Sequence, residues 1–443
     1  KETVSEQPGR IVSDLLAGQP DDYWKSACYY GIHYEGWAAQ TGIIERSKSG
    51  EISVGDRTRT WWFGASYGSG YGDTEGRGMI VGHMNALDRP GEWHWQDNTL
   101  YFIPPDGEEP RNVEAKRRQV AFDLSGQQHI RIEGLSVRAG SMRLDESSHC
   151  VVDGCDLAYI SHYTRHYDIG QIENGRNTIK SGETGIFVGG HDNSFLNCGV
   201  RFSAGAGFYL RGYHHTIHNC LIDEISYTSH YLNAITDAVS DFPEYENFLV
   251  GGHVITFNTM RNAGRHFFNF HGNGTSTQSR DRAPMDYMAT LFAHNHLYNG
   301  MLQTKDAGFL TGYYCSGGTL NDLNSQVVYN VMHDCYDLAA MRWGILGIVY
   351  LDAGTCDVDL HHNLLWAAPG SLQRGLWYNT MCVDVHERDN VFHPLFERTS
   401  ADLTAADFPD GVPFRLGHDF DNPPALPVWP QIDRSRIEAE SSP

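Results

Sequence analysis

Residues 185–197 read GIFVGGHDNSFLN, and residues 207–219 read GFYLRGYHHTIHN. Residues 246–258, ENFLVGGHVITFN, follow the same plan. Each unit has a short apolar run, a glycine turn, a second short apolar run and an asparagine 12 residues after its start. Runs this short, rich in β-branched and aromatic residues, predict strands rather than helices. The asparagine at each turn is expected to stack on its neighbours as a ladder.

The repeat extends along the chain if some turns are longer. The predicted strand starts fall at residues 122, 142, 185, 207, 246, 266, 301, 347 and 375. Short strands stacked coil upon coil predict an all-β fold, a right-handed parallel β-helix. Cys155, Cys198 and Cys220 each follow an expected ladder position. We therefore expect a stack of free, buried thiols there rather than disulfides.

The sequence predicts three segments. Residues 1–118 do not follow the repeat, hold six of the ten tryptophans and predict a β-rich accessory module. Residues 119–398 form the predicted β-helix. Residues 399–443 are polar and proline-rich, as in an extended tail or linker. The chain opens without methionine, so we expect a processed form or a fragment.

Composition disfavours several classes of partner. Lysine and arginine number 33 against 55 aspartates and glutamates, and the net charge of −22 argues against nucleic acid and anionic membranes. The sequence contains no apolar run of about 18 residues, so no membrane span is expected. An acidic chain with 12% aromatic residues and 47 glycines suits carbohydrate handling. A β-helix with both ends covered predicts a monomer.

Long insertions mark where a substrate would bind. They occupy residues 156–183, 271–287, 306–323 and 335–343, mostly in the second half of the predicted helix. Turns of this length form walls along one side of the coils, so they predict a cleft there.

Two aspartates carry the main catalytic hypothesis. Five residues after successive strand starts, glycines give way to His271, Asp306 and Asp352. Adjacent coils lie about 4.8 Å apart, so the two carboxylates are expected to be neighbours. Carboxylates about 5 Å apart suit a retaining glycosidase, and a separation of roughly 6.5–9.5 Å suits an inverting one. Aspartate before Ala-Gly is also good turn chemistry, so the pair could instead end two turns.

Other residues are candidates to bind the substrate. Lys305 and Arg211 stand just before the line of ionisable residues, where they can contact hydroxyls or a carboxylate. His271 is a candidate to orient the substrate or transfer a proton. Four further residues lie in long insertions, where they can stack on a sugar ring or bond it: Tyr313, Tyr314, Arg342 and Trp343.

No metal site is predicted. The sequence contains neither HExxH nor an EF-hand loop. The histidine pairs at 214–215, 294–296 and 361–362 straddle ladder positions, so stacking explains them.

Residues 87–93 (LDRPGEW), 100–105 (LYFIPP) and 130–135 (IRIEGL) resemble β-helix glycoside hydrolases of the pectate-lyase-like superfamily. In these enzymes a β-rich module is inserted among the early coils. The Asp306 element and residues 347–352 (GIVYLD) are similar to the catalytic region of glycoside hydrolase family 141 and its relatives. This resemblance implies action on fucosidic or xylosidic linkages of plant polysaccharides, with Asp306 and Asp352 as the catalytic pair.

Two departures from that family stand in the sequence. The leading coils expected before the inserted module are missing, and Ala353 replaces the second aspartate expected after Asp352. Residues 436–441 (RIEAES) resemble the first strand of a family 6 carbohydrate-binding module. This short match implies a secreted, polysaccharide-degrading protein.

Three functions compete. The first is a glycoside hydrolase that uses the aspartate pair and no cofactor. The second is a polysaccharide lyase, in which Lys305, Arg211 or His271 removes the proton beside a uronate carboxylate and the aspartates hold calcium. The third is a non-catalytic β-helix that binds carbohydrate. Long insertions favour an enzyme, and the few basic residues of the predicted cleft favour a hydrolase. The partner in each case is a polysaccharide or oligosaccharide.

Overall fold

The computed structural model describes residues 9–33, 39–55, 76–163, 170–173, 176–179, 184–228, 232–237, 250–271, 287–304, 307–313, 323–335, 347–352, 354–367, 374–379, 382–393 and 418–429. The chain divides into two compact units. One contains Lys1–Lys116 and Tyr163–Ile179, and the other contains Arg117–His162 and Lys180–Pro443. None of the helices in these described ranges is long and apolar enough to cross a membrane.

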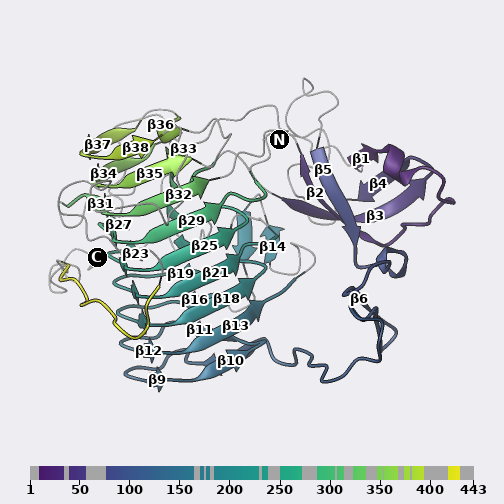
Figure 1. Cartoon of the computed structure of the whole chain (residues 1–443), viewed down its shortest axis with the longest axis horizontal. Helices are drawn as coiled ribbons and strands as arrows, with labels where there is room; N and C mark the ends of the chain where they lie inside the picture. Colours follow the sequence, from purple (N-terminus) through teal and green to yellow (C-terminus); the bar gives the residue numbers. More distant parts are fainter. Residues whose placement is uncertain are drawn as a thin grey trace. The chain divides into compact units, whose positions relative to one another are not determined.

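The described residues of the second unit form three parallel sheets of nine strands each (Figure 1). The first sheet contains β8 Val120–Asp123, β11 Ser141–Leu144, β16 Ile186–Val188, β19 Phe208–Leu210, β22 Ile235–Asp237, β26 Phe268–His271, β30 Leu310–Tyr313, β33 Gly347–Leu351 and β36 Arg374–Tyr378. The second contains β9 Arg131–Glu133, β12 Val151–Asp153, β17 Ser194–Leu196, β20 Thr216–His218, β24 Val254–Thr256, β28 Leu291–Ala293, β31 Ser325–Val328, β34 Cys356–His361 and β37 Val383–Arg388. The third contains β10 Ser136–Arg138, β13 Asp156–Ser161, β18 Gly199–Ser203, β21 Leu221–Ile225, β25 Thr259–Ala263, β29 His296–Gly300, β32 Val331–Cys335, β35 Leu364–Ala367 and β38 Val391–His393.

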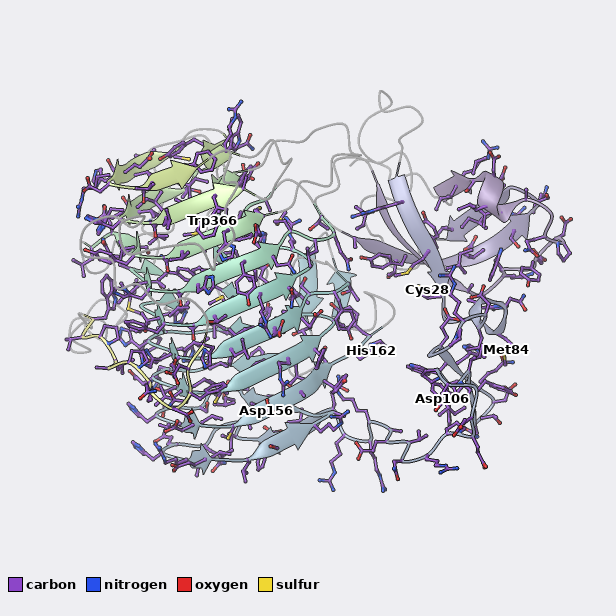
Figure 2. The ribbon with its side chains drawn as sticks, viewed as in Figure 1. Cys28, Met84, Asp106, Asp156, His162 and Trp366 are labelled. Carbon is purple, nitrogen blue, oxygen red and sulfur yellow. The ribbon has the colours of Figure 1, made fainter. Side chains whose placement is uncertain are left out.

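Each coil contributes one strand to each sheet, so the predicted right-handed parallel β-helix is confirmed. Strands pair with their counterparts in the next coil: Ile186 pairs with Phe208, and Phe208 with Ile235. These three side chains are fully buried in one continuous core. Alternation along each strand turns the intervening residues outward, which places the outer columns of side chains one coil apart. Figure 2 labels Asp156 and Trp366 near opposite ends of the third sheet.

The asparagine ladder lies at the corner between the second and third sheets. Each amide donates to the carbonyl of the coil below and to the side-chain oxygen of the next asparagine; Asn295, for example, bonds Ile255 O at 2.9 Å and Asn330 Oδ1 at 3.1 Å. Each side-chain oxygen also accepts the backbone N–H of the preceding ladder residue. The ladder consists of Asn258, Asn295, Asn330, Asn363 and Asn390.

The ladder begins later than the repeat predicts, because the first units are out of register by one residue. Cys220 N–H donates to Asn258 Oδ1 at 2.9 Å, so Cys220 itself occupies the ladder position. Asn197 and Asn219 instead occupy the preceding position, where both have positive φ angles (54° and 51°). Left-handed backbone of this kind is easiest for asparagine and glycine.

The predicted thiol stack is confirmed. Cys155, Cys198 and Cys220 are free and at most 1% exposed. Small apolar groups fill this corner in the early coils, where no amide ladder has yet begun.

A second ladder runs along the corner between the first and second sheets. Each of its side chains accepts the backbone N–H of the preceding coil: Asn193 from Cys150, His215 from Asn193 and His253 from His215. His215 accepts through Nδ1, so its proton sits on Nε2, which donates to Arg211 O at 3.0 Å. The imidazoles of His215 and His253 stack with 5.2 Å between their centroids. This supports the prediction that stacking explains the histidine pair at 214–215.

Acid should therefore destabilise the β-helix. Burial lowers the pKa of His215 to about 4, below the 6.5 of an ordinary histidine. The unfolded chain then binds more protons than the folded one between those values, so stability is lost as pH falls from 6.5 toward 4. For His215, the difference between these two pKa values corresponds to about 3 kcal/mol of the free energy of unfolding. Burial also lowers the pKa of His253, His294 and His296, which adds to the loss.

The His215→Asn variant tests this dependence, because Asn193 already fills the same ladder position with a non-titrating acceptor. Urea unfolding at pH 7.0 and pH 4.5 should show a smaller loss of stability in this variant than in the wild type. An equal loss in both proteins would contradict the assignment.

The first unit contains an antiparallel five-stranded sheet with the order β1-β4-β3-β2-β5. Its strands are β1 Gly9–Val12, β2 Cys28–His33, β3 Gln40–Lys48, β4 Glu51–Gly55 and β5 Gly76–Val81. Two hairpins accompany the sheet: β6 Trp93–Gln96 with β7 Thr99–Phe102, and β14 Gly170–Glu173 with β15 Arg176–Ile179. Trp93 and Trp95 are each 57% exposed, whereas Trp24 packs against the small core of the sheet.

Residues 418–429 run along the second sheet as an extended strap. Asp419 O accepts from Asn219 at 3.5 Å, and Pro424 O pairs with His218 at 3.0 Å. Trp429 donates to Ala289 O at 3.1 Å and packs against an apolar patch of the sheet. These described residues of the predicted 399–443 tail are therefore held by the β-helix.

Candidate active site

The candidate site is a column of outward-facing positions at the carboxyl edge of the first sheet. His271 pairs with Tyr313. Gly312 pairs with Leu351, so the residues that follow this pair, Tyr313 and Asp352, lie beside each other. Leu351 pairs with Tyr378, which places Asn379 beside Asp352. Leu210 pairs with Asp237 in β22, and β22 pairs with β26, which ends at His271. Arg211, which follows Leu210, therefore lies at the level of His271, two coils away. We call Arg211, His271, Tyr313, Asp352 and Asn379 the candidate column.

Four residues predicted to form the site therefore share one line on the protein. At about 4.8 Å per coil, Asp352 lies one coil from Tyr313, two from His271 and four from Arg211, or about 5, 10 and 19 Å along the stack. The structure describes only the backbone of His271 and Tyr313. From Arg211 to Asp352 the column therefore extends about 19 Å along the stack.

Asp352 is partly buried and firmly held. Its Oδ1 accepts from Asn379 Nδ2 at 2.8 Å, and its backbone N–H donates to Gly312 O at 2.8 Å. Its carbonyl accepts from Thr355 twice, at 3.1 Å from the backbone N–H and at 2.7 Å from the hydroxyl. These contacts fix both the turn and the direction of the carboxylate.

Burial and charge also affect the neighbours of Asp352. Burial, reinforced by the Asp352 carboxylate, raises the pKa of the Cys382 thiol to about 11. Cys382 Sγ lies 3.8 Å from Asp352 O. Burial and the Glu387 carboxylate, which accepts from the Tyr378 hydroxyl at 3.1 Å, raise the pKa of Tyr378. Both groups therefore stay protonated at neutral pH beside Asp352.

Arg211 marks the other end of the candidate column. Its Nη1 lies 3.9 Å from Asp145 Oδ1, and its side chain is 18% exposed. Its backbone carbonyl accepts the His215 proton, so the ladder at the corner fixes the start of this turn. A guanidinium held in this way presents hydrogen-bond donors suited to hydroxyl or carboxylate oxygens.

The next column toward the middle of the sheet forms a buried wall. Thr236, Asn269 and Thr311 face outward, yet each is at most 6% exposed. Asn269 Oδ1 accepts from Asn233 at 2.9 Å, and Thr311 Oγ1 pairs with His266 Nδ1 at 3.1 Å. These polar groups are bonded within the coil stack.

The expected alignment of Asp306 with Asp352 is not the one found. Strand β30, which pairs with β33, begins at Leu310, whereas the repeat predicts a strand from Met301. Met301 adopts a positive φ of 57° at the end of β29 and donates to Arg265 O, so the Met301 run forms the turn instead. Burial of Phe309 and Leu310 sets the register, and Tyr313 becomes the neighbour of Asp352.

Several predicted site residues fall on parts that the structure does not describe. Lys305, Asp306, Tyr314, Arg342 and Trp343 lie outside the described residues. Their roles stay predictions, as does the cleft, because most of the long insertions also lie there.

Asn379 and Cys382 were missed by sequence reasoning. The signal for Asn379 is a match between Tyr350-Leu351-Asp352 and Trp377-Tyr378-Asn379, which becomes visible once the two strands are aligned by their aromatic residues. Cys382 carries no such signal, because it reaches Asp352 through a turn.

Comparison with known proteins agrees with the fold. No family model matches the sequence, and no curated protein matches it significantly. Among solved structures, a chain named "Glycoside hydrolase" superposes with a TM-score of 0.54 at 11% identity. The match covers 86% of this chain and 74% of the other. At this identity the likeness shows a shared fold.

Proposed function

We propose that this protein is a glycoside hydrolase that cleaves a polysaccharide or oligosaccharide bound along the candidate column. The observation that carries the proposal is the shared register of Arg211, His271, Tyr313 and Asp352 on one face. The named glycoside hydrolase with the same fold supports it. So does the sequence resemblance to family 141, from which we propose plant polysaccharides as the substrate class.

Asp352 acts as one carboxylate of the catalytic pair. A carboxylate that accepts an amide N–H from Asn379 is held in one orientation and suits the ionised partner, nucleophile or general base. The second carboxylate, which protonates the leaving oxygen, then comes from a residue outside the described ranges. Asp306 stays the candidate predicted from sequence, although its neighbour Ala307 precedes β30 and Asp352 lies beside the residue that ends β30. Arg211 and His271 bind sugar hydroxyls away from the scissile bond, and Tyr313 lies beside Asp352 in the register.

We also propose that the protein acts outside the cell. Cys356, four residues after Asp352, is disulfide-bonded. Disulfides persist in oxidising compartments, which supports secretion. The resemblance of residues 436–441 to a family 6 carbohydrate-binding module points the same way.

The test is a screen with two readouts. The protein is incubated with neutral and uronate-containing plant and algal polysaccharides, and reducing ends are measured beside the ultraviolet absorbance of unsaturated uronate. New reducing ends without absorbance support the hydrolase. Absorbance that rises with the ends identifies a lyase, and binding without turnover identifies a carbohydrate-binding β-helix; either result overturns the proposal.

A further inference from the structure

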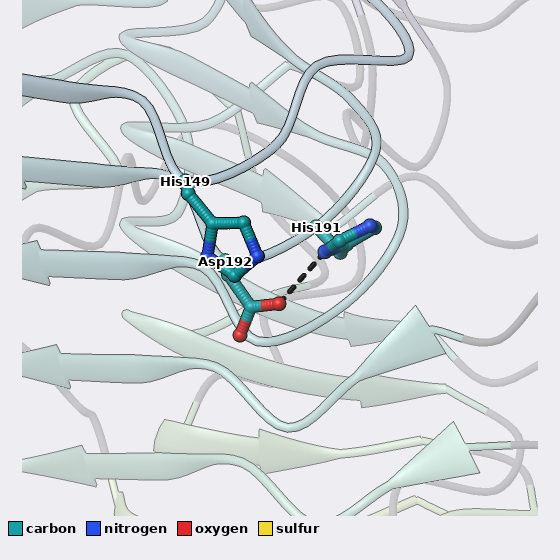
Figure 3. Close-up of side chains that lie close together, drawn as sticks. All are labelled: His149, His191 and Asp192. Carbon is teal, nitrogen blue, oxygen red and sulfur yellow. Dashed lines mark hydrogen bonds and ion pairs between the residues drawn. The ribbon is translucent and has the colours of Figure 1, made fainter. Parts of the chain in front are cut away.

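A cluster of imidazoles surrounds one carboxylate at the corner between the first and second sheets, in the early coils. His191 Nδ1 lies 2.7 Å from Asp192 Oδ2, and His214 Nδ1 lies 3.7 Å from Asp192 Oδ1. One ligand atom each from His149, His191 and Asp192 lies within 4.8 Å of the other two. Figure 3 shows the Asp192 carboxylate reaching His191, with the His149 ring beside it.

The coil repeat explains why these side chains meet. Ser148, His191 and Tyr213 pair as successive bridges, so His149, Asp192 and His214 follow at the same level of three adjacent coils. All three have left-handed backbone, with φ of 53°, 53° and 56°. Residues at such a corner turn their side chains out of the wall, so consecutive coils stack them about 4.8 Å apart.

We propose that His149, His191 and Asp192 form a binding site for a zinc ion. Two imidazoles and a carboxylate are borderline donors that suit Zn²⁺ rather than calcium or magnesium. Tetrahedral ligand atoms at zinc lie about 3.4 Å apart, so a closure of about 1 Å by side-chain rotation completes the site. The ligands are only partly buried (28% exposed for His191 and 15% for Asp192), which leaves room for water as the fourth ligand.

The surrounding residues support the ligands. The His214 side chain, which is 4% exposed, lies 3.7 Å from the Asp192 carboxylate and closes this side of the site. His191 stacks on Tyr213 with centroids 5.1 Å apart, and His149 stacks on His129 at 5.0 Å. These flat contacts restrict both rings to the corner. The predicted absence of a metal site rested on motifs within one segment, whereas this site joins two coils whose ligands are 42 residues apart in sequence, from His149 to His191.

Isothermal titration of the metal-free protein with zinc chloride tests the site. We expect one Zn²⁺ per chain, bound at micromolar concentration or tighter, and a rise in melting temperature on addition of the metal. His149→Asn and Asp192→Asn should each weaken binding at least 10-fold. Asparagine tolerates the left-handed backbone at both positions.

His362→Asn is the matched control, since His362 has the same backbone conformation (φ 55°), lies between β34 and β35 and contacts none of the three ligands. Its zinc affinity should stay within twofold of the wild type. Melting curves without metal verify that each variant folds. Absence of saturable binding below 1 mM zinc, or equal affinity in wild type, His149→Asn and Asp192→Asn, overturns the proposal. Polysaccharide turnover is measured separately, so a failed zinc site and a failed hydrolase give different results.

Discussion

Asp352→Asn should lower the rate of polysaccharide hydrolysis at least 10³-fold while the protein stays folded. Positioned acids and bases each contribute roughly 10²–10⁴-fold, and loss of one member of a catalytic pair removes most of the benefit of the other. Asparagine has the same shape and keeps a carbonyl oxygen that accepts from Asn379 Nδ2, now 2.8 Å from Asp352 Oδ1. The effect should therefore appear in kcat and leave the turn at Gly312 and Thr355 in place.

Asp384→Asn is the matched control. Asp384 is exposed on β37 of the second sheet, away from the candidate column, so this variant should keep full activity. Initial rates of reducing-end release, with thermal melting of each variant, make the comparison. Activity within threefold of the wild type in Asp352→Asn would show that Asp352 only ends a turn, which is the alternative that its Ala-Gly context left open.

Asn295→Ala should lower the free energy of unfolding by about 4 kcal/mol. Asn295 is 1% exposed and is the second member of the ladder. Its loss removes the acceptor of the Asn258 N–H and the amide donor to the Ile255 carbonyl. The Asn258 amide and the Asn330 side-chain oxygen each lose one of two bonds, keeping those to Ile217 O and to the backbone N–H of residue 295. A buried polar group left unsatisfied costs about 1–3 kcal/mol, and some relaxation of the corner reduces the total.

Cys198→Ala gives the contrast at the same corner. Cys198 is fully buried, and its thiol lies 3.1 Å and 3.6 Å from two carbonyls and beside the Cys220 thiol, so the substitution removes one sulfur atom from the thiol stack. We expect a cost of about 1 kcal/mol. Urea unfolding followed by circular dichroism measures both variants. Equal costs would mean that the ladder contributes packing alone and that its hydrogen bonds are replaced by water.

The sequence repeat predicts the architecture because every coil must bury the same face. Apolar runs such as Ile186–Val188 and Phe208–Leu210 recur with glycine turns between them, and parallel stacking is how such runs cover one another. Strand register is harder to predict where a turn is long. Met301 and Leu302 look like a strand start, but Phe309 and Leu310 fill the core better. The alternation of side chains along a strand does not show how many residues lie in the turn before it.

The candidate site likewise divides into residues that the sequence repeat predicts and residues that depend on the strand register. His271 and Asp352 keep their predicted level because His271 ends its strand and Asp352 directly follows its own. Arg211 and Tyr313 join them in the column only after pairing is known, and Asn379 emerges from the last strand of the sheet. The zinc ligands depend on two coils meeting at one corner, which no local motif encodes.

The strap of residues 418–429 changes how the β-helix should come apart. A stack of repeats behaves as a one-dimensional chain in which each unit is coupled to its two neighbours. The strap contacts the coil of β20 through Pro424 and the coil of β28 through Trp429, so it adds a coupling that skips a unit. Coils within its reach then unfold as one cooperative block. The coils at the two ends of the stack, with β8 to β10 and with β36 to β38, lie beyond these anchors, and they should open first.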